Sequence, residues 1–272
     1  ECFSAAYEAG QQGEIFHRYI LGVYDLYERL ISKFPQILFE SCASGGGRFD
    51  PGMLYYAPQA WASDDSDAVE RLKIQYGSSY AYPVSSMGAH VSVAPNHQLY
   101  RITPMETRGN VAYFGAFGYE LDLTKLSEED HAIVRRQIAF MKKYRSLIHN
   151  GTFYRLKSPF EGNITAWMVV SPDKKQAVVA YFKVLSETTS PFRRLKLQGL
   201  QENTRYHEVD LAAEGMDTSM QKGVQPGYFY GNELMNVGLV TSDYSVGEVS
   251  KEKHCADFWS RIIVLEAEED CP

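Results

Sequence analysis

The fold is decided at residues 36–77, which read QILFESCASGGGRFDPGMLYYAPQAWASDDSDAVERLKIQYG. Two short strand-like segments, residues 36–41 and 58–63, are each followed directly by a polar loop. The first is a short apolar run, typical of a strand that a parallel sheet buries on both faces. In barrels built from such strands, the functional groups lie in the loops that follow the strands. The stretch therefore predicts strands that carry two neighbouring functional loops.

Helical and strand-like patterns alternate through the first half of the chain. Apolar residues recur every three or four positions over residues 11–34, and Pro35 ends that predicted helix. A second helix is predicted over residues 127–151, where Ser127 is the N-cap and Gly151 the terminator. The other predicted elements are a helix over 66–77 with Ser66 as its N-cap and Gly77 past its end, strands over 78–86 and 117–123, and a helix over 105–114. About four alternations favour parallel strands with helical crossovers, in either a (β/α) barrel or a doubly wound sheet.

The second half of the chain changes to one strand after another. Strands are predicted at residues 164–170, 176–185, 193–200, 204–209 and 258–267. Short strands joined by turns predict an antiparallel β-sandwich of about eight strands. We therefore divide the chain into an α/β barrel portion, residues 1–156, and an all-β sandwich, residues 157–272, whose expected role is to support the barrel.

Composition narrows the possible partners. The 272 residues carry a net charge of −7 with a pI of 5.6, and Lys and Arg are scattered, so we expect no nucleic-acid partner and no anionic membrane surface. No apolar run approaches the roughly 20 residues of a membrane span, and the first residues do not resemble a signal peptide. The four cysteines lack metal-ligand and disulfide spacing, so we expect no metal, reduced thiols and a cytoplasmic location.

The loop after the first predicted strand is rich in glycine. Gly45, Gly46 and Gly47 allow the backbone to approach a ligand because no Cβ intervenes, but a tight turn explains them equally well. No phosphate-binding glycine motif is present. Cys42 could be a nucleophile at the strand end, yet no His lies in a recognisable partnering motif, and lone cysteines are more often small buried hydrophobic residues.

The loop after the second predicted strand contains three carboxyl groups. Asp65 and Asp67 are explained as acidic residues at a helix N-terminus. Asp64 follows Trp61 by three positions, so a carboxyl and an aromatic platform could meet one sugar ring. A carboxyl beside apolar surface has its neutral form favoured, as a general acid requires. Structural roles are expected for the other polar candidates, which are His90, His97, Glu106 and Arg108.

Two long segments resemble the microbial α-galactosidases of glycoside hydrolase family 36. They read HRYILGVYDLYERLISKFPQILFESCASGGGRFDPGMLYYAPQAWASDDSDAVERLKIQYG, residues 17–77, and SSMGAHVSVAPNHQ, residues 85–98. The likeness runs almost continuously from about residue 17 to residue 123. It implies a TIM-type (β/α)8 barrel followed by a C-terminal antiparallel β domain, and hydrolysis of terminal α-linked galactose with net retention and without a cofactor.

The resemblance also implies roles for four residues. The aspartate of the family's Trp-x-x-Asp motif is the general acid/base, and it falls on Asp64 here. The Cys and Gly of the family's SCxxGGG loop line the galactose subsite, which maps to Cys42 and Gly45. The motif tryptophan maps to Trp61. Contact with galactose would give Cys42 a role that needs no thiolate.

This chain departs from the family pattern in one respect. The family's nucleophile is the aspartate of a Lys-Trp-Asp motif, and none of Trp61, Trp167 and Trp259 is followed by Asp. The chain also lacks a starting Met, so we expect a piece of a longer protein that holds the second half of the barrel, without the nucleophile. Retention needs two carboxyl groups about 5–5.5 Å apart, so we predict that this chain alone does not turn over substrate.

Two alternatives stay open. One is a non-catalytic module that binds galactosides or another partner through the same loops. The other is α-N-acetylgalactosaminidase activity, ranked lower because the loop at residues 41–47 is typical of galactose-specific members. Expected partners are α-galactosides of the melibiose or raffinose type. The open edges of a half-barrel also predict a homo-oligomer, or disorder near residues 1–12.

Overall fold

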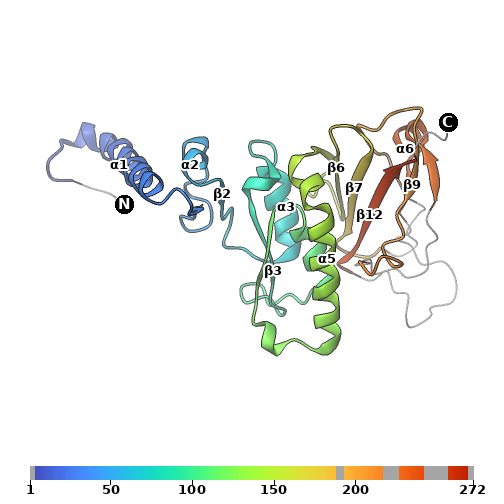
Figure 1. Ribbon diagram of the computed structural model, residues 1–272. Helices are drawn as coiled ribbons and strands as arrows, with labels where there is room; N and C mark the ends of the chain where they lie inside the picture. Colours follow the sequence, from blue (N-terminus) through green and yellow to red (C-terminus); the bar gives the residue numbers. More distant parts are fainter. Residues whose placement is uncertain (1–3, 188–192, 217–226, 242–256, 269–272) are drawn as a thin grey trace. The chain divides into compact units, whose positions relative to one another are not determined.

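The structure is a computed structural model that describes residues 4–187, 193–216, 227–241 and 257–268 (Figure 1). The chain divides into two compact units, Glu1–Asp64 and Asp65–Pro272, which are described separately. Within the described residues, no helix has both the length and the apolar character needed to cross a membrane.

The first unit contains one long helix and a small parallel sheet. Helix α1, Gln12–Lys33, confirms the predicted helix over residues 11–34, and the 3-10 helix η1, Ala9–Gln11, precedes it. Helix α2, Pro51–Tyr56, connects strands β1, Glu40–Ser41, and β2, Gln59–Ala60, which pair in parallel. Tyr24 and Tyr27 of α1 pack their rings against Tyr56 of α2, with centroids 5.5 and 6.4 Å apart.

The first predicted strand is shorter than its apolar pattern suggests. Only its last two residues pair with a neighbour, and Leu38 is 86% exposed while Ile37 is also exposed. The sheet that the described residues form here has two strands. Burial on both faces was therefore a wrong prediction for this segment. Phe39 packs its ring against Tyr27 of α1, with centroids 5.9 Å apart, whereas Ile37 and Leu38 are exposed. The predicted disorder near residues 1–12 falls in part on residues 1–3, outside the described residues.

The second unit begins with another parallel pair. Strands β3, Gly88–Ser92, and β4, Ala116–Glu120, are joined by helix α4, Met105–Ala112, as a strand–helix–strand crossover. Helix α3, Ala68–Ser78, precedes this pair, and the 3-10 helix η3, Leu123–Lys125, follows it. Parallel strands with helical crossovers are thus present in both units, as predicted.

Two local predictions in this region were wrong. Residues 78–86 were predicted as a strand, but they end α3 and continue through turns into the 3-10 helix η2, Val84–Ser86. Pro83 has no backbone N–H to give to a sheet, and the strand starts only at Gly88. Helix α3 begins after Asp67 instead of Ser66, and Gly77 lies inside the helix, which ends at Ser78.

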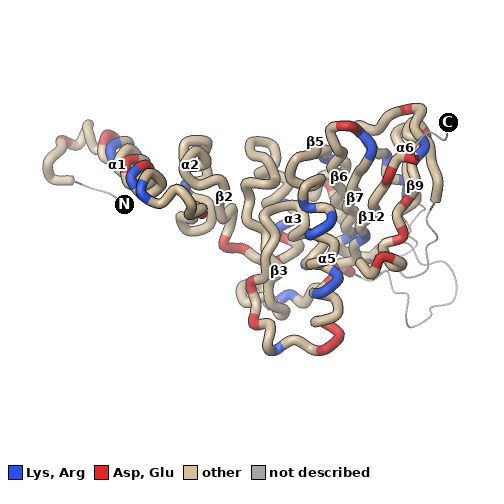
Figure 2. The backbone as a smooth tube through the Cα atoms, in the orientation of Figure 1, with Lys and Arg blue, Asp and Glu red and all other residues tan. Residues whose placement is uncertain are grey.

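Helix α5, Glu128–Asn150, confirms the strongest helical pattern of the sequence. Ser127 is its N-cap and accepts a hydrogen bond from the N–H of Asp130 at 3.1 Å. Three acidic residues, Glu128, Glu129 and Asp130, lie in the first turn of the helix, which is favourable for the helix dipole (Figure 2). Gly151 ends the helix, as predicted.

An antiparallel sheet follows, in the strand order β10-β9-β12-β7-β6-β5. The strands are β5, Thr152–Lys157; β6, Ile164–Val170; β7, Gln176–Lys183; β9, Arg205–Glu208; β10, Tyr228–Tyr230; and β12, Trp259–Ala267. A separate two-stranded antiparallel sheet consists of β8, Arg194–Leu195, and β11, Leu239–Val240, and helix α6, Gly231–Asn236, precedes β11. The predicted antiparallel sheet is confirmed.

Both faces of this sheet are buried. Along β6, Trp167 belongs to the core that contains Phe140 of α5, whereas Met168 belongs to the core that contains Leu195 of β8 and Leu234 of α6. The alternation places neighbouring side chains on opposite faces. The sheet therefore lies between α5 on one side and a small layer of β8, β11 and α6 on the other. The predicted sandwich was wrong in one respect, because a helix covers one face.

Polar bonds join the parallel pair to the antiparallel sheet within the second unit. The Ser260 hydroxyl on β12 is fully buried, and the Asn110 side chain of α4 donates to it at 2.9 Å. The Thr107 hydroxyl lies 2.8 Å from the same oxygen and donates to the Phe258 carbonyl at 2.6 Å. Buried hydroxyls with satisfied partners fix one geometry, so α4 and β12 are packed in a specific register.

Candidate functional site

The loop after β1 takes a conformation that requires glycine. We call residues 42–50 the glycine loop. Gly45 and Gly46 have φ angles of +69° and +94°, and Ser44 also has a positive φ of +49°. Two backbone hydrogen bonds close the turn, from the Gly47 N–H to the Ala43 carbonyl at 3.0 Å and from the Phe49 N–H to the Gly46 carbonyl at 2.9 Å. The left-handed backbone at Gly45 and Gly46 is strained for any residue with a Cβ.

The glycine loop lies directly against the residues that follow β2. A Cβ on Gly45 would lie under 3.0 Å from the Asp64 nitrogen and 3.1 Å from the Asp64 Cγ. A Cβ on Gly46 would lie 2.6 Å from the Ala62 carbonyl oxygen. The glycines are therefore needed for the two loops to touch, and the contact brings together Gly45 and Asp64.

Cys42 and Trp61 leave the parallel pair at the same end. Ser41 pairs with Ala60, and the Trp61 N–H donates to the Ser41 carbonyl at 2.9 Å. The Cys42 thiol is free and the residue is exposed, whereas Trp61 is half-buried and Asp64 is exposed. The first unit thus supplies a thiol, an indole and a carboxyl from two adjoining loops. The other three cysteines lie outside the described residues.

Two further side chains of the glycine loop were not found from the sequence. Arg48 donates from Nη2 to the Cys42 carbonyl at 3.2 Å and from Nη1 to the Tyr19 hydroxyl at 3.4 Å. Asp50 accepts from the Tyr24 hydroxyl at 3.1 Å and caps α2 by accepting from the Met53 N–H at 3.0 Å. An aspartate before a proline is a helix-start signal that could have identified Asp50. Arg48 has no local signal, because its partner Tyr19 lies 29 positions away on α1.

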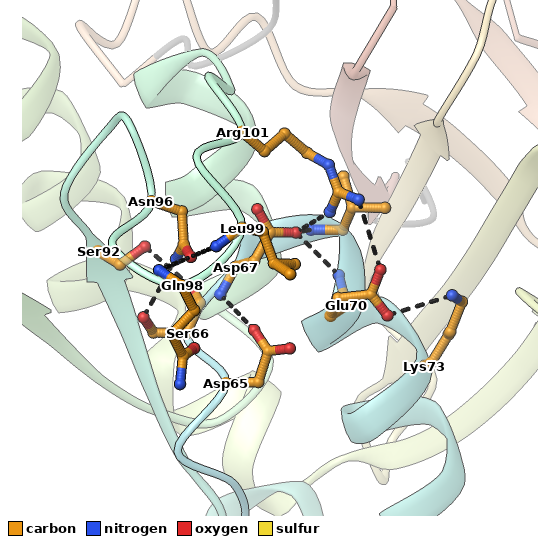
Figure 3. Close-up of polar contacts among 11 residues, drawn as sticks. Asp65, Ser66, Asp67, Glu70, Lys73, Ser92, Asn96, Gln98, Leu99 and Arg101 are labelled. Atoms are coloured by element: carbon orange, nitrogen blue, oxygen red, sulfur yellow. Dashed lines mark hydrogen bonds and ion pairs between the residues drawn. The ribbon is translucent and has the colours of Figure 1, made fainter.

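A polar network fixes the start of α3 in the second unit (Figure 3). Asp67 is 1% exposed, and its Oδ1 accepts from the N–H groups of Val69 at 3.0 Å and Glu70 at 3.2 Å. Arg101 pairs with the same carboxylate and lies 3.5 Å from Glu70. The Asp67 N–H donates to Asp65 at 3.0 Å. The expectation that Asp67 is a structural acid at a helix N-terminus is confirmed.

The loop after β3 is tied to this helix start by Asn96. Its Nδ2 donates to the Ser66 hydroxyl at 3.4 Å, and its Oδ1 accepts from the N–H groups of Gln98 and Leu99. The Ser92 hydroxyl donates to the Ser66 carbonyl at 2.8 Å. Ser66 is thus engaged through its side chain and its carbonyl, which explains why Asp67 is the cap of α3.

Asp67→Asn is expected to lower the free energy of unfolding by about 2–4 kcal/mol, because Arg101 loses its buried counter-charge and two helix N–H groups lose a charged acceptor. Urea denaturation of the protein measures this loss. Asp122→Asn is the matched control, since Asp122 caps η3 by accepting from the Thr124 N–H on an exposed surface. A loss at Asp67 no larger than the loss at Asp122 would contradict the role of the network.

Two of the other polar candidates of the sequence, Arg108 and His90, contact groups of the surrounding fold. Arg108 donates to the Ser92 carbonyl, and burial lowers the pKa of its guanidinium. His90 lies 3.7 Å from Glu120 across β3 and β4. His97 is exposed and Glu106 is half-buried. Within residues 4–187, 193–216, 227–241 and 257–268, no group of three His, Cys, Asp or Glu side chains is placed to hold a metal ion.

A cavity of about 440 Å³ lies in the second unit, and none of its lining residues belongs to the glycine loop or to the loop after β2. It opens between the β5–β6 connection and β8, and its charged lining residues are Lys157, Glu161, Glu187, Arg193 and Arg194. Arg193 and Glu187 form an ion pair at 2.6 Å across it. The cavity brings no residue of the two loops together, so the candidate site remains the loop pair of the first unit.

Comparison with protein families gives two matches. The model described as Melibiase matches residues 1–151, and the model described as Glycosyl hydrolase family 36 C-terminal domain matches residues 164–265. Together the two matches cover the two parallel strand pairs, β1–β2 and β3–β4, and most of the antiparallel sheet.

Curated relatives and solved structures agree with these matches. The chain is 55% identical over 224 residues to alpha-galactosidase AgaA of Geobacillus stearothermophilus, and 48% identical over 231 residues to alpha-galactosidase Mel36A of Lactobacillus acidophilus. These alignments cover 82% and 85% of this chain but 31% and 30% of the relatives, so the chain spans about a third of their length. The crystal structure of the alpha-galactosidase from Lactobacillus brevis superposes with a TM-score of 0.86 at 48% identity, covering 100% of this chain and 34% of that one. A variant of AgaA in complex with raffinose superposes with a TM-score of 0.83 at 48% identity, covering 98% and 34%.

Proposed function

Because the chain belongs to glycoside hydrolase family 36, the melibiases, we propose that it forms part of a retaining α-galactosidase. The proposed reaction is hydrolysis of terminal α-linked galactose from oligosaccharides of the melibiose or raffinose type. The observation that carries the proposal is the close packing of Gly45 against Asp64. This contact joins two predicted site residues that lie in different loops. The relatives that match the same region of the chain are named alpha-galactosidases.

We assign Asp64 the role of general acid/base. As a carboxylic acid it donates its proton to the glycosidic oxygen while the bond from that oxygen to the anomeric carbon breaks and a carboxylate nucleophile bonds to that carbon. As a carboxylate it then takes a proton from water, whose oxygen attacks the anomeric carbon and releases the nucleophile. Asp64 is exposed at the loop pair, where a sugar can reach it.

The proposed galactose subsite is formed by Cys42, Gly45 and Trp61. Cys42 and Trp61 follow paired residues at one end of β1 and β2, which supports a common ligand. Gly45 offers backbone without a Cβ, so a sugar hydroxyl can approach the loop closely. The indole of Trp61 supplies the flat apolar face that a sugar ring requires. No metal or organic cofactor enters this chemistry.

The nucleophile is proposed to come from a segment outside this chain. A retaining mechanism needs a second carboxyl group about 5–5.5 Å from the first. The sequence contains no Lys-Trp-Asp motif, so we propose that the chain alone binds galactosides without hydrolysing them. From membership of the family we also propose that β1, β2, β3 and β4 are consecutive strands of one (β/α)8 barrel. Residues 1–156 would then belong to the barrel and residues 157–272 to the supporting domain. Homo-oligomerisation and a cytoplasmic location are part of the proposal.

Structures of relatives support the proposed substrate class. One AgaA variant that carries an Asp-to-Asn substitution was solved with raffinose, and another that carries an Asp-to-Ala substitution was solved with stachyose. An intact oligosaccharide is expected to persist where an aspartate needed for its cleavage has been removed.

The test compares the full-length protein with the chain of residues 1–272. We expect the full-length protein to release galactose from raffinose, with the α-anomer formed first when product formation is followed by NMR. The isolated chain is expected to bind galactose without turnover. Release of the β-anomer first would exclude retention. Hydrolysis of an α-N-acetylgalactosaminide faster than of raffinose would favour α-N-acetylgalactosaminidase activity. A full-length protein that binds galactosides but releases no sugar would favour the non-catalytic module.

A further inference from the structure

We propose that Arg48 is a positioning residue, which couples helix α1 to the glycine loop and holds Cys42 in the orientation that galactose binding requires. The kinetic test of this role rests on the proposed function. The structural basis does not, because it consists of the contacts that the Arg48 guanidinium makes within the first unit.

The Cys42 carbonyl is the first backbone acceptor beyond the ladder. The Ser41 carbonyl still accepts from the Trp61 N–H at 2.9 Å. One residue later, the Cys42 carbonyl accepts from Arg48 Nη2 at 3.2 Å. A carbonyl that is held in place fixes the plane of its peptide group, and with it the direction of the preceding side chain. The last carbonyl held by the sheet is thus that of Ser41, and the next carbonyl, that of Cys42, is held by Arg48.

The second contact of Arg48 lies on α1. Its Nη1 donates to the Tyr19 hydroxyl at 3.4 Å. Its Nε is shielded from solvent and has no hydrogen-bond partner among the described residues. A planar guanidinium cannot bend around one of its nitrogens, so the two donating nitrogens move as a rigid fork. The position of the Cys42 carbonyl is thereby linked to the position of Tyr19 on the helix.

The other end of the glycine loop is tied to the same helix. The Tyr24 hydroxyl donates to Asp50 at 3.1 Å, and a Cβ on Gly52 would collide with that hydroxyl. Tyr19 and Tyr24 thus hold the two sides of one loop through Arg48 and Asp50. Between these ties the loop contains the left-handed residues Gly45 and Gly46. A loop whose middle residues are glycine depends on its anchored ends for precise geometry, because glycine itself restricts the backbone least.

The role predicts a specific kinetic signature. Cys42 is proposed to contact galactose in both the ground state and the transition state, so misplacing it removes uniform binding. Arg48→Met in the full-length protein is expected to raise KM for raffinose about tenfold, with kcat within about threefold of wild type. Arg48→Lys is expected to recover part of the loss, because an ammonium can donate to the Cys42 carbonyl without reaching both partners.

A double-mutant cycle separates positioning from direct contact. If Arg48 acts through Cys42, Arg48→Met changes KM less than about twofold in a Cys42→Ala background. Multiplicative effects of the two substitutions would show that Arg48 acts independently of Cys42, which overturns the proposal. A large fall in kcat at unchanged KM would overturn it as well, because it would place Arg48 at the reacting atoms.

Hydrogen–deuterium exchange tests the tether without any turnover. Amides of residues 42–50 are expected to exchange at least about threefold faster in Arg48→Met than in wild type. Arg29→Met is the matched control, since Arg29 lies on α1, as Tyr19 does, but pairs there with Asp25 at 2.7 Å. Tyr19→Phe, which removes one hydroxyl, is expected to give a smaller change in the same peptide and guards against a misfolded Arg48 variant. Unchanged exchange in a folded Arg48→Met protein refutes the tether, whereas an inactive wild type with faster exchange in this variant refutes only the proposed function.

Discussion

Asp64→Asn is expected to lower kcat of the full-length protein toward raffinose by about 10²–10⁴-fold, the range that a positioned general acid or base contributes. Asparagine matches the size of the aspartate but cannot exchange a proton with the glycosidic oxygen or with water. Folding is expected to stay intact, because the Asp64 side chain is exposed. Steady-state kinetics at saturating raffinose measure the loss.

The leaving group provides a sharper test of the acid role. A p-nitrophenyl galactoside departs as a stable phenolate, so the first step with this substrate should suffer less from Asp64→Asn than the first step with raffinose. A pre-steady-state burst of p-nitrophenol is then expected, because hydrolysis of the intermediate still lacks its base. The matched control is Asp65→Asn, a neighbouring carboxylate that accepts the Asp67 N–H in the second unit. Equal losses for the two variants would remove the assignment of Asp64.

Gly45→Ala is expected to lower kcat/KM of the full-length protein by at least about 10²-fold, since small displacements of catalytic groups have effects of this size. The new methyl group would overlap the Asp64 nitrogen and would lie 3.1 Å from the Asp64 Cγ. The overlap is with the backbone nitrogen of Asp64, so relieving it shifts the Asp64 backbone and with it the carboxyl group. Kinetics with raffinose measure the loss, and thermal denaturation verifies that the variant is folded.

Gly215→Ala is the matched control for backbone strain. Gly215 has the same φ of +69° as Gly45, but a Cβ there would meet nothing within 4 Å. Both variants are expected to lose about 1–2 kcal/mol from the left-handed conformation, while only Gly45→Ala loses activity. Comparable activity of the two variants would mean that the contact with Asp64 has no catalytic importance.

The sequence predicted elements whose signals are local. The helix over residues 127–151 has its cap, its acidic first turn and its terminator within one stretch, and α5 agrees with all three. The cap of α3 was predicted one residue early, because Ser66 and Asp67 are both good cap residues. The choice depends on Ser92 and Asn96, which engage Ser66 from 26 and 30 positions away. No local pattern contains that information.

The same limit applies to the candidate site. Gly45 and Asp64 stood out because each follows a strand-like segment, and the structure places them in contact. Whether Asp64, Cys42 and Trp61 have their implied roles stays a prediction. Arg48 was not predicted as a site residue. One of its partners, Tyr19, is distant in the sequence, and the other, the Cys42 carbonyl, is a backbone group that any residue carries. The sandwich prediction failed in one layer because strand patterns do not specify what covers them, and here α5 covers one face.

The buried hydroxyl of Ser260 constrains how this protein can evolve. The two family models divide the chain between residues 151 and 164, which invites exchange of the C-terminal module between homologues. Asn110 and Ser260 lie on opposite sides of that division, 150 positions apart, and share one hydrogen bond in the interior. A recombinant that placed an aliphatic residue at position 260 would leave the Asn110 amide without this acceptor, at a cost of about 1–3 kcal/mol. Exchange of one module therefore keeps this part of the stability only where the incoming sequence has a hydrogen-bond acceptor at position 260.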